Sequence, residues 1–183
     1  MKMKLAFPPA AVLAMILSGG VAVATVEAQE YKYIGVEACG KCHKTAKIGN
    51  QLAVWEQSKH SKAYATLQTP QADSIALATG LATKAAESET CLGCHTTAGP
   101  DAGVKPDEGI GCERCHNPGS GYKGLSVMKD RAKSIEAGMR DMGSPETIET
   151  MCRTCHNEKS PSFKAFNFAE RWEEIKHLRP TAP

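Results

Sequence analysis

The sequence has few aromatic residues, no run of alternating apolar residues, and no cysteine outside four short repeats. Phe, Trp and Tyr make up 5% of the 183 residues, so the chain has little of the large flat apolar surface that fills most protein cores. Because no alternating run is present, no β-strand is predicted. All eight cysteines lie inside the repeats, which leaves no thiol for a disulfide, a nucleophile or a separate metal site.

The four repeats share the pattern Cys-x-x-Cys-His. In this pattern both thiols add across the vinyl groups of a haem as thioethers, and the adjacent histidine binds the iron. A zinc knuckle or a redox dithiol also uses Cys-x-x-Cys, but neither requires a histidine directly after the second cysteine. The sequence therefore predicts four covalently attached haem c groups. The predicted haem-binding residues are Cys39, Cys42, His43, Cys91, Cys94, His95, Cys112, Cys115, His116, Cys152, Cys155 and His156.

Residues 1–28 are predicted to be a secretory signal peptide. A basic start leads into an apolar run over residues 5–23, and residues 26–28 supply the small side chains of a cleavage site. A retained membrane anchor is the alternative, but the run is short and interrupted for a span of about 20 residues. Residues 29–183 then form a single tetrahaem domain. Because haem c is attached outside the bacterial inner membrane, the predicted location is the periplasm, with the cell surface or exterior as alternatives.

The small number of residues for each haem predicts the architecture. The mature chain would offer roughly 39 residues for each haem, too few to enclose four macrocycles and also build a separate apolar core. The predicted fold is therefore mainly α with extensive irregular loops, a compact multihaem cytochrome c fold in which the haems form most of the core. The chain without haem should be largely unfolded, as small metal domains are without their metal.

Apolar periodicity and capping residues predict where the helices lie. Helices are expected at residues 45–67, from 73 to about 88, from 126 to near 143, after Ser144, and before Pro180. Asp73 is expected to cap the second, and Ser144 to cap the fourth with Pro145 at its first position. The Gly-, Pro- and Asp-rich stretch between His95 and Cys112 is expected to be a loop, which places the second and third haems close together.

The histidine count limits the axial ligands of the four irons. The sequence has six histidines, of which only His60 and His177 lie outside the repeats, so at most two haems can have two histidine ligands. An ordinary surface histidine beside a packed tryptophan is the alternative for His60. Met128 follows the third repeat after a Gly-rich turn and is the leading thioether candidate, with core packing as its alternative. The predicted iron ligands are His43, His95, His116, His156, His60, His177 and, as a candidate, Met128.

The charge balance gives no sign of a nucleic-acid partner. The formal net charge is +2, and each haem adds two propionates against about one positive charge on its ferric core, so the loaded protein is expected to be acidic. Basic residues near the third repeat are predicted propionate partners or a solvated face. They are Lys123, Lys129, Arg131 and Lys133.

No catalytic acid or base is predicted from the sequence. Glu108, Glu113 and Glu158 lie near the repeats and are as readily explained as surface groups. The expected partners are redox proteins that donate and accept electrons, with no nucleic acid and no stable membrane insertion of the mature chain. The oligomeric state is left open.

Three stretches resemble the cytochrome c-554 family of tetrahaem cytochromes. They are Trp55–His60 after the first repeat, Gly109–Tyr122 around the third, and Cys155–Phe163 before His177. The resemblance covers essentially the whole mature chain. It implies a compact helical protein with closely stacked haem pairs, a periplasmic electron carrier, and one haem that can lack a sixth ligand. The family's name-giving member has enough histidines for three bis-histidine haems, whereas this chain has enough for two.

The predicted function is electron transfer between redox partners by hopping along four haems, without enzyme activity. A first alternative is reduction of nitric oxide, nitrite or peroxide at an open haem, which predicts a high-spin iron that binds carbon monoxide or nitric oxide. A second alternative is a subunit of an extracellular haem filament, which predicts polymers. The sequence favours neither alternative.

Overall fold

The computed structural model describes residues 30–99 and 103–177, and it is built from short helices joined by long irregular segments. No β-strand occurs in these residues, so the predicted fold class is confirmed. No helix among them has the length and apolar character needed to cross a bilayer. The predicted signal peptide lies outside the described residues.

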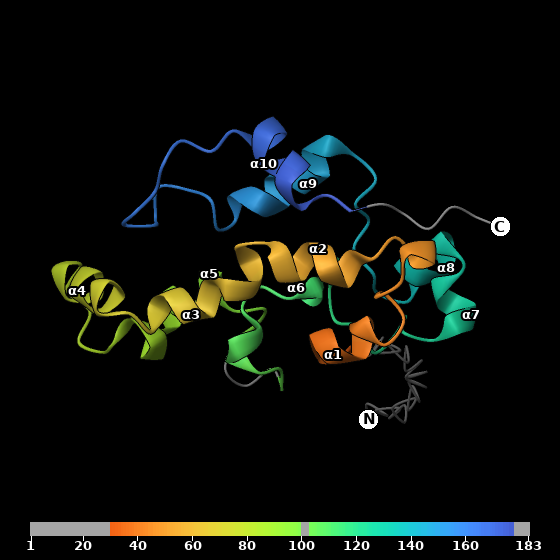
Figure 1. The fold of residues 1–183 in the computed structure, drawn as a ribbon, viewed down its shortest axis with the longest axis horizontal. Coiled ribbons are helices and arrows are strands. Elements are labelled where there is room, and N and C mark those ends of the chain that lie inside the picture. Colours follow the sequence, from red (N-terminus) through yellow and green to blue (C-terminus); the bar gives the residue numbers. More distant parts are fainter. Residues whose placement is uncertain (1–29, 100–102, 178–183) are drawn as a thin grey trace, which may run out of the picture.

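Among the residues that the structure describes, the longest helices have nine residues. The α-helices are α1 (Gly35–Gly40), α2 (Gln51–Gln57), α3 (Ala63–Leu67), α4 (Pro70–Ala78), α5 (Glu89–His95), α6 (Cys112–His116), α7 (Leu125–Met128), α8 (Arg131–Glu136), α9 (Pro145–Arg153) and α10 (Phe168–Ile175). Short 3₁₀ turns are η1 (Ala46–Ile48), η2 (His60–Lys62), η3 (Ala85–Glu87) and η5 (Pro106–Glu108). In Figure 1, α2 and α3 cross the middle of the molecule, α9 and α10 lie above them, and α1 lies below.

The helix predicted over residues 45–67 is wrong as a continuous element. Gly49 (φ 104°) and Asn50 (φ 50°) are both left-handed, a conformation that ends a right-handed helix. A second break follows α2, because Ser58 is extended and its hydroxyl donates to the Trp55 carbonyl (2.7 Å). The sequence is therefore divided into η1, α2, η2 and α3, and His60 lies in a short turn of its own.

Thr69, rather than Asp73, caps α4. The Thr69 hydroxyl accepts from the Ala72 N–H (3.2 Å) and Pro70 takes the first helical position, which is where proline fits best. The Asp73 carboxylate instead accepts from the N–H of Ala85 (3.0 Å). The expected cap is wrong, and Asp73 ties α4 to η3, which precedes the second haem motif.

The helix expected from residue 126 to near 143 is two short helices, α7 and α8. Asp130 interrupts it, because its carboxylate caps α8 by accepting from the Lys133 N–H (3.2 Å). Gly138 follows α8 with φ 100°, so the chain leaves helical geometry well before residue 143.

The two C-terminal helices agree better with the sequence. The Ser144 hydroxyl accepts from the Thr147 N–H (3.2 Å) at the start of α9, with Pro145 at its first position, so this prediction is confirmed. Helix α10 ends at Ile175, which places His177 two residues beyond the helix rather than within it.

The protein's own apolar core is small. The buried hydrophobic side chains of the described residues are Val36, Leu67, Ala76, Ala85, Ile110, Tyr122 and Ile148. Three of these, Leu67, Ala76 and Ala85, form one cluster beneath the second haem motif. Burying apolar surface stabilises a fold by about 25 cal/mol per Å². Because so few side chains are buried, the protein's own core contributes little of this stabilisation.

Candidate haem-binding site

Each Cys-x-x-Cys-His motif forms one turn of helix. The second motif ends α5 and the third forms α6. In the first and fourth motifs the same turn is closed by bonds from the His43 N–H to the Cys39 carbonyl (3.1 Å) and from the His156 N–H to the Cys152 carbonyl (3.0 Å). Residues three and four apart share a helix face, so both cysteines and the histidine project to one side, as covalent haem attachment requires.

Two motif histidines are oriented by hydrogen bonds to Nδ1. His95 Nδ1 lies 2.8 Å from the Ala63 carbonyl, which can only accept, so this nitrogen carries the proton. His43 Nδ1 lies 3.2 Å from Gln51 Oε1, and the Gln51 amide is oriented because its Nε2 donates to the Ile48 carbonyl (2.5 Å). Protonation at Nδ1 leaves Nε2 as the metal-binding nitrogen in both rings.

The two histidines outside the motifs each face a motif histidine. The ring centroids of His60 and His156 are 6.1 Å apart, and those of His116 and His177 are 5.8 Å apart. Two imidazoles that bind one metal through bonds of about 2 Å would hold their ring centroids about 6 Å apart. The sequence did not indicate which spare histidine serves which motif, and the structure brings His60 to the fourth motif and His177 to the third.

Burial favours the neutral, metal-binding form of two of the paired histidines, His116 and His60. Burial, reinforced by the charge of His177, lowers the pKa of His116 to about 4. Burial also lowers the pKa of His60, with a further contribution from His156. A neutral imidazole has a free lone pair at physiological pH, so neither ring must lose a proton before it can bind iron.

Cysteines from different motifs lie side by side. A hydrogen bond between the thiols of Cys39 and Cys112 lowers the pKa of the first and raises that of the second. Burial raises the pKa of Cys94, and the charge of Cys155 and a hydrogen bond with it raise this pKa further. The attachment points of the first and third motifs are therefore adjacent, as are those of the second and fourth.

Glu113 is buried, so its assignment as a surface group is wrong. Its side chain is 3% exposed, and its carboxylate accepts from the backbone N–H groups of Ile34 (2.9 Å), Gly35 (2.8 Å) and Gly119 (2.6 Å). These three N–H donors replace the hydrogen bonds that water would make to the charged carboxylate. Glu113 thereby holds the segment that begins α1 against the third motif, and sequence reasoning missed this role.

The other two carboxylates differ from Glu113. Glu108 is half-buried and accepts from the Val36 N–H (2.9 Å), a second contact between α1 and the segment before the third motif. Glu158 is exposed, as the surface interpretation predicts.

The segment before the third motif positions His60. The Ile110 N–H donates to the His60 carbonyl (2.9 Å), and Trp55 Nε1 donates to the Ile110 carbonyl (2.7 Å). Gly109 has φ 61°, and a Cβ at this position would lie 2.5 Å from the His60 carbonyl oxygen. Only glycine allows this approach, so Trp55 and Gly109 act together to hold the His60 turn.

Thr97 joins the end of the second motif to the start of the third. Its hydroxyl accepts from the Gly111 N–H (2.8 Å) and donates to the Gly109 carbonyl (3.1 Å). The described parts of the loop expected between His95 and Cys112, residues 96–99 and 103–111, contain the short turn η5. The two motif segments are close in space, as the sequence predicts.

Met128 is half-buried at the end of α7. Among the contacts of the described residues, none joins Met128 to a motif histidine, and His177 is the residue that faces His116 of the preceding motif. The ligation of Met128 stays a prediction.

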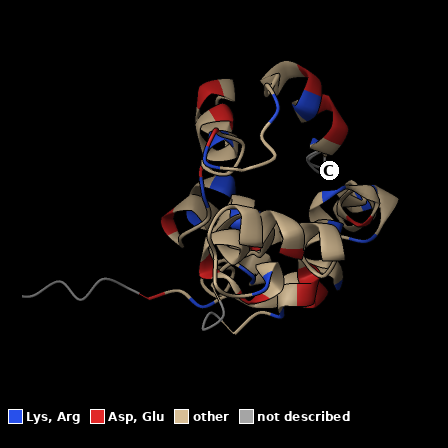
Figure 2. Cartoon of the chain, turned by 90° about the vertical axis from the view of Figure 1, so that its left-hand side faces the viewer, with Lys and Arg blue, Asp and Glu red and all other residues tan. Residues whose placement is uncertain are grey.

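The cations expected to bind propionates belong partly to surface ion pairs. Arg131 pairs with Asp141, and Lys133 pairs with Asp130 (3.5 Å). Lys123 is exposed and remains a candidate propionate partner. Figure 2 shows basic and acidic residues mixed along the described chain.

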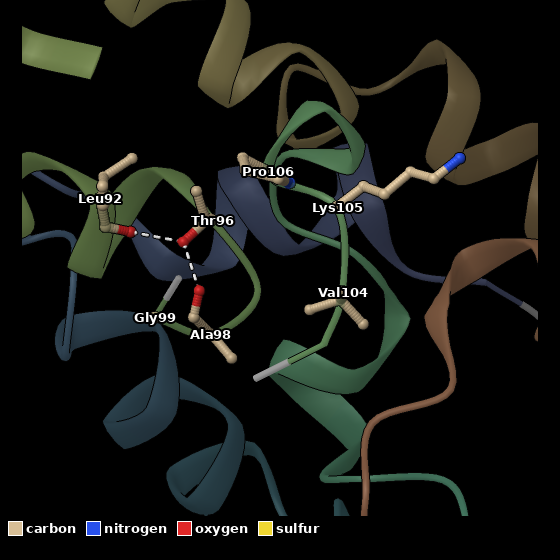
Figure 3. Close-up of a pocket in the computed structure, with 7 residues that line it drawn as sticks. All are labelled: Leu92, Thr96, Ala98, Gly99, Val104, Lys105 and Pro106. Atoms are coloured by element: carbon tan, nitrogen blue, oxygen red, sulfur yellow. Dashed lines mark hydrogen bonds between the residues drawn. The ribbon is translucent and has the colours of Figure 1, made fainter. Parts of the chain in front are cut away.

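Two hollows border the motifs. The smaller lies beside the second motif, where the Thr96 hydroxyl donates to the carbonyls of Leu92 (2.8 Å) and Ala98 (2.7 Å) (Figure 3). Its volume of about 20 Å³ holds one water molecule. The larger, about 400 Å³, lies along the α9 face that contains Met151, beside Arg140. Arg140 Nε donates to the Cys115 carbonyl (2.9 Å), so this hollow lies next to the third motif and is open to the surface.

Comparisons with known proteins find similarity to c-type cytochromes. Residues 38–117 match the family described as "Cytochrome c554 and c-prime". Cytochrome c-554 of Nitrosomonas europaea is 25% identical over 144 residues, an alignment that covers 70% of this chain and 59% of the relative. The chain thus spans less than two thirds of this relative's length. No solved structure matches the chain.

Proposed function

Because residues 38–117 match the family described as "Cytochrome c554 and c-prime", we propose that the chain belongs to this family and is a c-type cytochrome that carries four haems and passes electrons between redox proteins. The observation that carries the proposal is that all four motifs form the same helical turn, while both remaining histidines face a motif histidine. The haems, numbered 1 to 4 by motif, supply one-electron redox chemistry.

The residues around each iron divide into attaching and coordinating groups. The eight cysteines form the thioethers, and His43, His95, His116 and His156 bind haems 1 to 4 in that order. His60 is the second ligand of haem 4 and His177 that of haem 3, because their rings have the separation that two imidazoles on one iron require.

Adjacent attachment points support short steps for electron hopping. Cys39 lies beside Cys112, and Cys94 beside Cys155, so haem 1 adjoins haem 3 and haem 2 adjoins haem 4. We place the mature protein, residues 29–183, in the periplasm after removal of residues 1–28. Protein partners would deliver and remove the electrons.

Haem content tests this proposal. The purified mature protein is expected to exceed the mass of its chain by four haem groups, to give a pyridine haemochrome spectrum for four haems, and to take up four electrons in a reductive titration. Replacing Cys91 and Cys94 with serine should remove one haem and leave three. A protein that holds zinc or fewer than four haems would contradict the proposal.

A second function, reduction of nitric oxide, nitrite or peroxide, is favoured by the division of the histidines. All six histidines lie within the described residues, and both spare ones face the third and fourth motifs. Haems 1 and 2 therefore have an iron face for a non-histidine ligand, such as a thioether, water or a substrate. Carbon monoxide added to the reduced protein should bind two haems, whereas a spectrum unchanged by carbon monoxide and nitric oxide excludes this activity.

A further inference from the structure

Arg114 joins the third haem motif to the fourth. It lies inside the third motif, between Cys112 and Cys115, on α6. Its Nη2 donates to the sulfur of Cys155 (3.2 Å), 41 residues further along the chain. The side chain is half-buried, so its charge is screened less by solvent than a charge at the surface.

The charge of Arg114 also reaches the second and third motifs. Burial raises the pKa of the Cys94 and Cys115 thiols, and Arg114 opposes this shift at both. Arg131, Arg153 and Arg171 are paired with carboxylates at the surface, and Arg140 donates to the Cys115 carbonyl. Arg114 instead directs its guanidinium at a haem-attaching sulfur.

A fixed positive charge favours the reduced form of a nearby haem, because reduction adds one negative charge. A guanidinium stays charged at every physiological pH, so its effect on the potential is permanent. The attraction falls with distance. Arg114 lies inside the third motif and donates to a sulfur of the fourth motif (3.2 Å), so haems 3 and 4 would lie nearest to its charge.

We propose that Arg114 raises the reduction potentials of haems 3 and 4 relative to haems 1 and 2, and so directs electrons toward haems 3 and 4. The inference rests on the proposed four-haem function. Arg114 acts through its positive charge and does not bind an iron. Haem 4, whose sulfur accepts its hydrogen bond, should be the most affected.

The size of the effect follows from Coulomb's law. A unit charge about 12 Å from an iron, in an effective dielectric of about 20, changes the equilibrium constant for one-electron reduction about tenfold, which equals about 59 mV. Replacing Arg114 with glutamine should lower the midpoint of haem 4 by this amount, with a smaller shift at haem 3. Haems 1 and 2 should change least.

The test is a spectroelectrochemical titration of the haem-loaded protein, with each haem identified by its electron paramagnetic resonance signal. Arg114→Lys, which keeps the charge, should retain most of the wild-type potentials. Lys159→Gln removes an exposed cation three residues after the fourth motif and should leave the potentials unchanged. Arg114→Met, which keeps the apolar stem, replaces Arg114→Gln if the latter is not recovered with full haem content.

Unchanged potentials in the Arg114→Gln protein, or equal shifts at all four haems, would overturn the inference. A downward shift in Arg114→Lys as large as that in Arg114→Gln would also overturn it, because the hydrogen bond and not the charge would then be responsible. The haem content, measured by mass on the same samples, separates these outcomes from a failure of the four-haem proposal.

Discussion

Single residues hold the first and third motifs together. Glu113 binds three backbone N–H groups from the two sides of this junction, and Glu108 adds a fourth contact through Val36. Tyr122 is buried nearby, and its hydroxyl donates to the carbonyls of His116 (3.1 Å) and Asn117 (2.7 Å). These bonds fix the backbone around the His116 imidazole without taking up its metal-binding nitrogen.

Replacing Glu113 with alanine should destabilise the protein by about 3 kcal/mol or more, because three N–H groups lose their acceptor in a buried site. The thermal unfolding midpoint of the haem-loaded protein measures this loss. Glu158→Ala, which removes an exposed carboxylate near the fourth motif, is the control and should have a midpoint close to that of the wild type. Equal midpoints for the two variants would contradict the role of Glu113.

Short elements, rather than long helices, carry the distal ligands. His60 lies in η2, held by Trp55 and by the Gly109–Ile110 segment. His177 follows the end of α10. The position of each distal histidine therefore depends on contacts between segments far apart in the sequence.

Gly109→Ala should displace the His60 turn, because the added Cβ would meet the His60 carbonyl at 2.5 Å. We expect the low-spin signal of haem 4 to weaken or disappear in electron paramagnetic resonance spectra. Gly103→Ala is the matched control. Gly103 also has a positive φ (76°), but a Cβ added there would have nothing within 4 Å, so backbone strain alone acts at that position. Loss of the signal in both variants would show that strain, and not the contact with His60, is responsible.

Ser144→Ala should reduce stability by about 1 kcal/mol, because α9 loses the hydroxyl that accepts from the Thr147 N–H. Denaturant unfolding of the haem-loaded protein measures the change. Ser126→Ala, at an exposed position inside α7, should have little effect. A larger loss for Ser126→Ala than for Ser144→Ala would contradict the capping assignment.

Elements whose start and stop signals lie within a few residues were predicted correctly from the sequence. Predictions failed where contacts with residues far along the chain determine the structure. Ser144-Pro145 is a local start signal, and α9 begins there. The break at Gly49 and Asn50 was missed because the apolar periodicity of residues 48, 52 and 55 continues through it. Burial of Glu113 depends on N–H groups 78 and 79 residues away, which no periodicity reveals. The fourfold motif was readable because haem attachment needs its residues within five positions.

In the molecule as a whole, the haems supply what the chain lacks. Few hydrophobic side chains of the described residues are buried, and the motifs are distributed along α1, α5, α6 and α9. Four macrocycles between these short helices would provide the missing apolar surface. Folding and haem attachment are therefore expected to be linked.

The chain produced without haem should be largely unfolded. Its far-ultraviolet circular dichroism is expected to lack the helical minima of the loaded protein, and heating should give no cooperative transition, because the small core cannot offset the conformational entropy of the chain. The loaded protein, measured in the same buffer, provides the reference. A cooperative transition in the haem-free chain would show that the protein core suffices.

The most direct test of the proposed ligation is electron paramagnetic resonance of the oxidised, haem-loaded protein, with the spins of each haem type counted. We expect two bis-histidine low-spin haems for each chain. The variants His60→Ala and His177→Ala should each convert one of these two haems to a different coordination. Three or four bis-histidine haems, or two that persist in both variants, would contradict the assignment of His60 to haem 4 and His177 to haem 3.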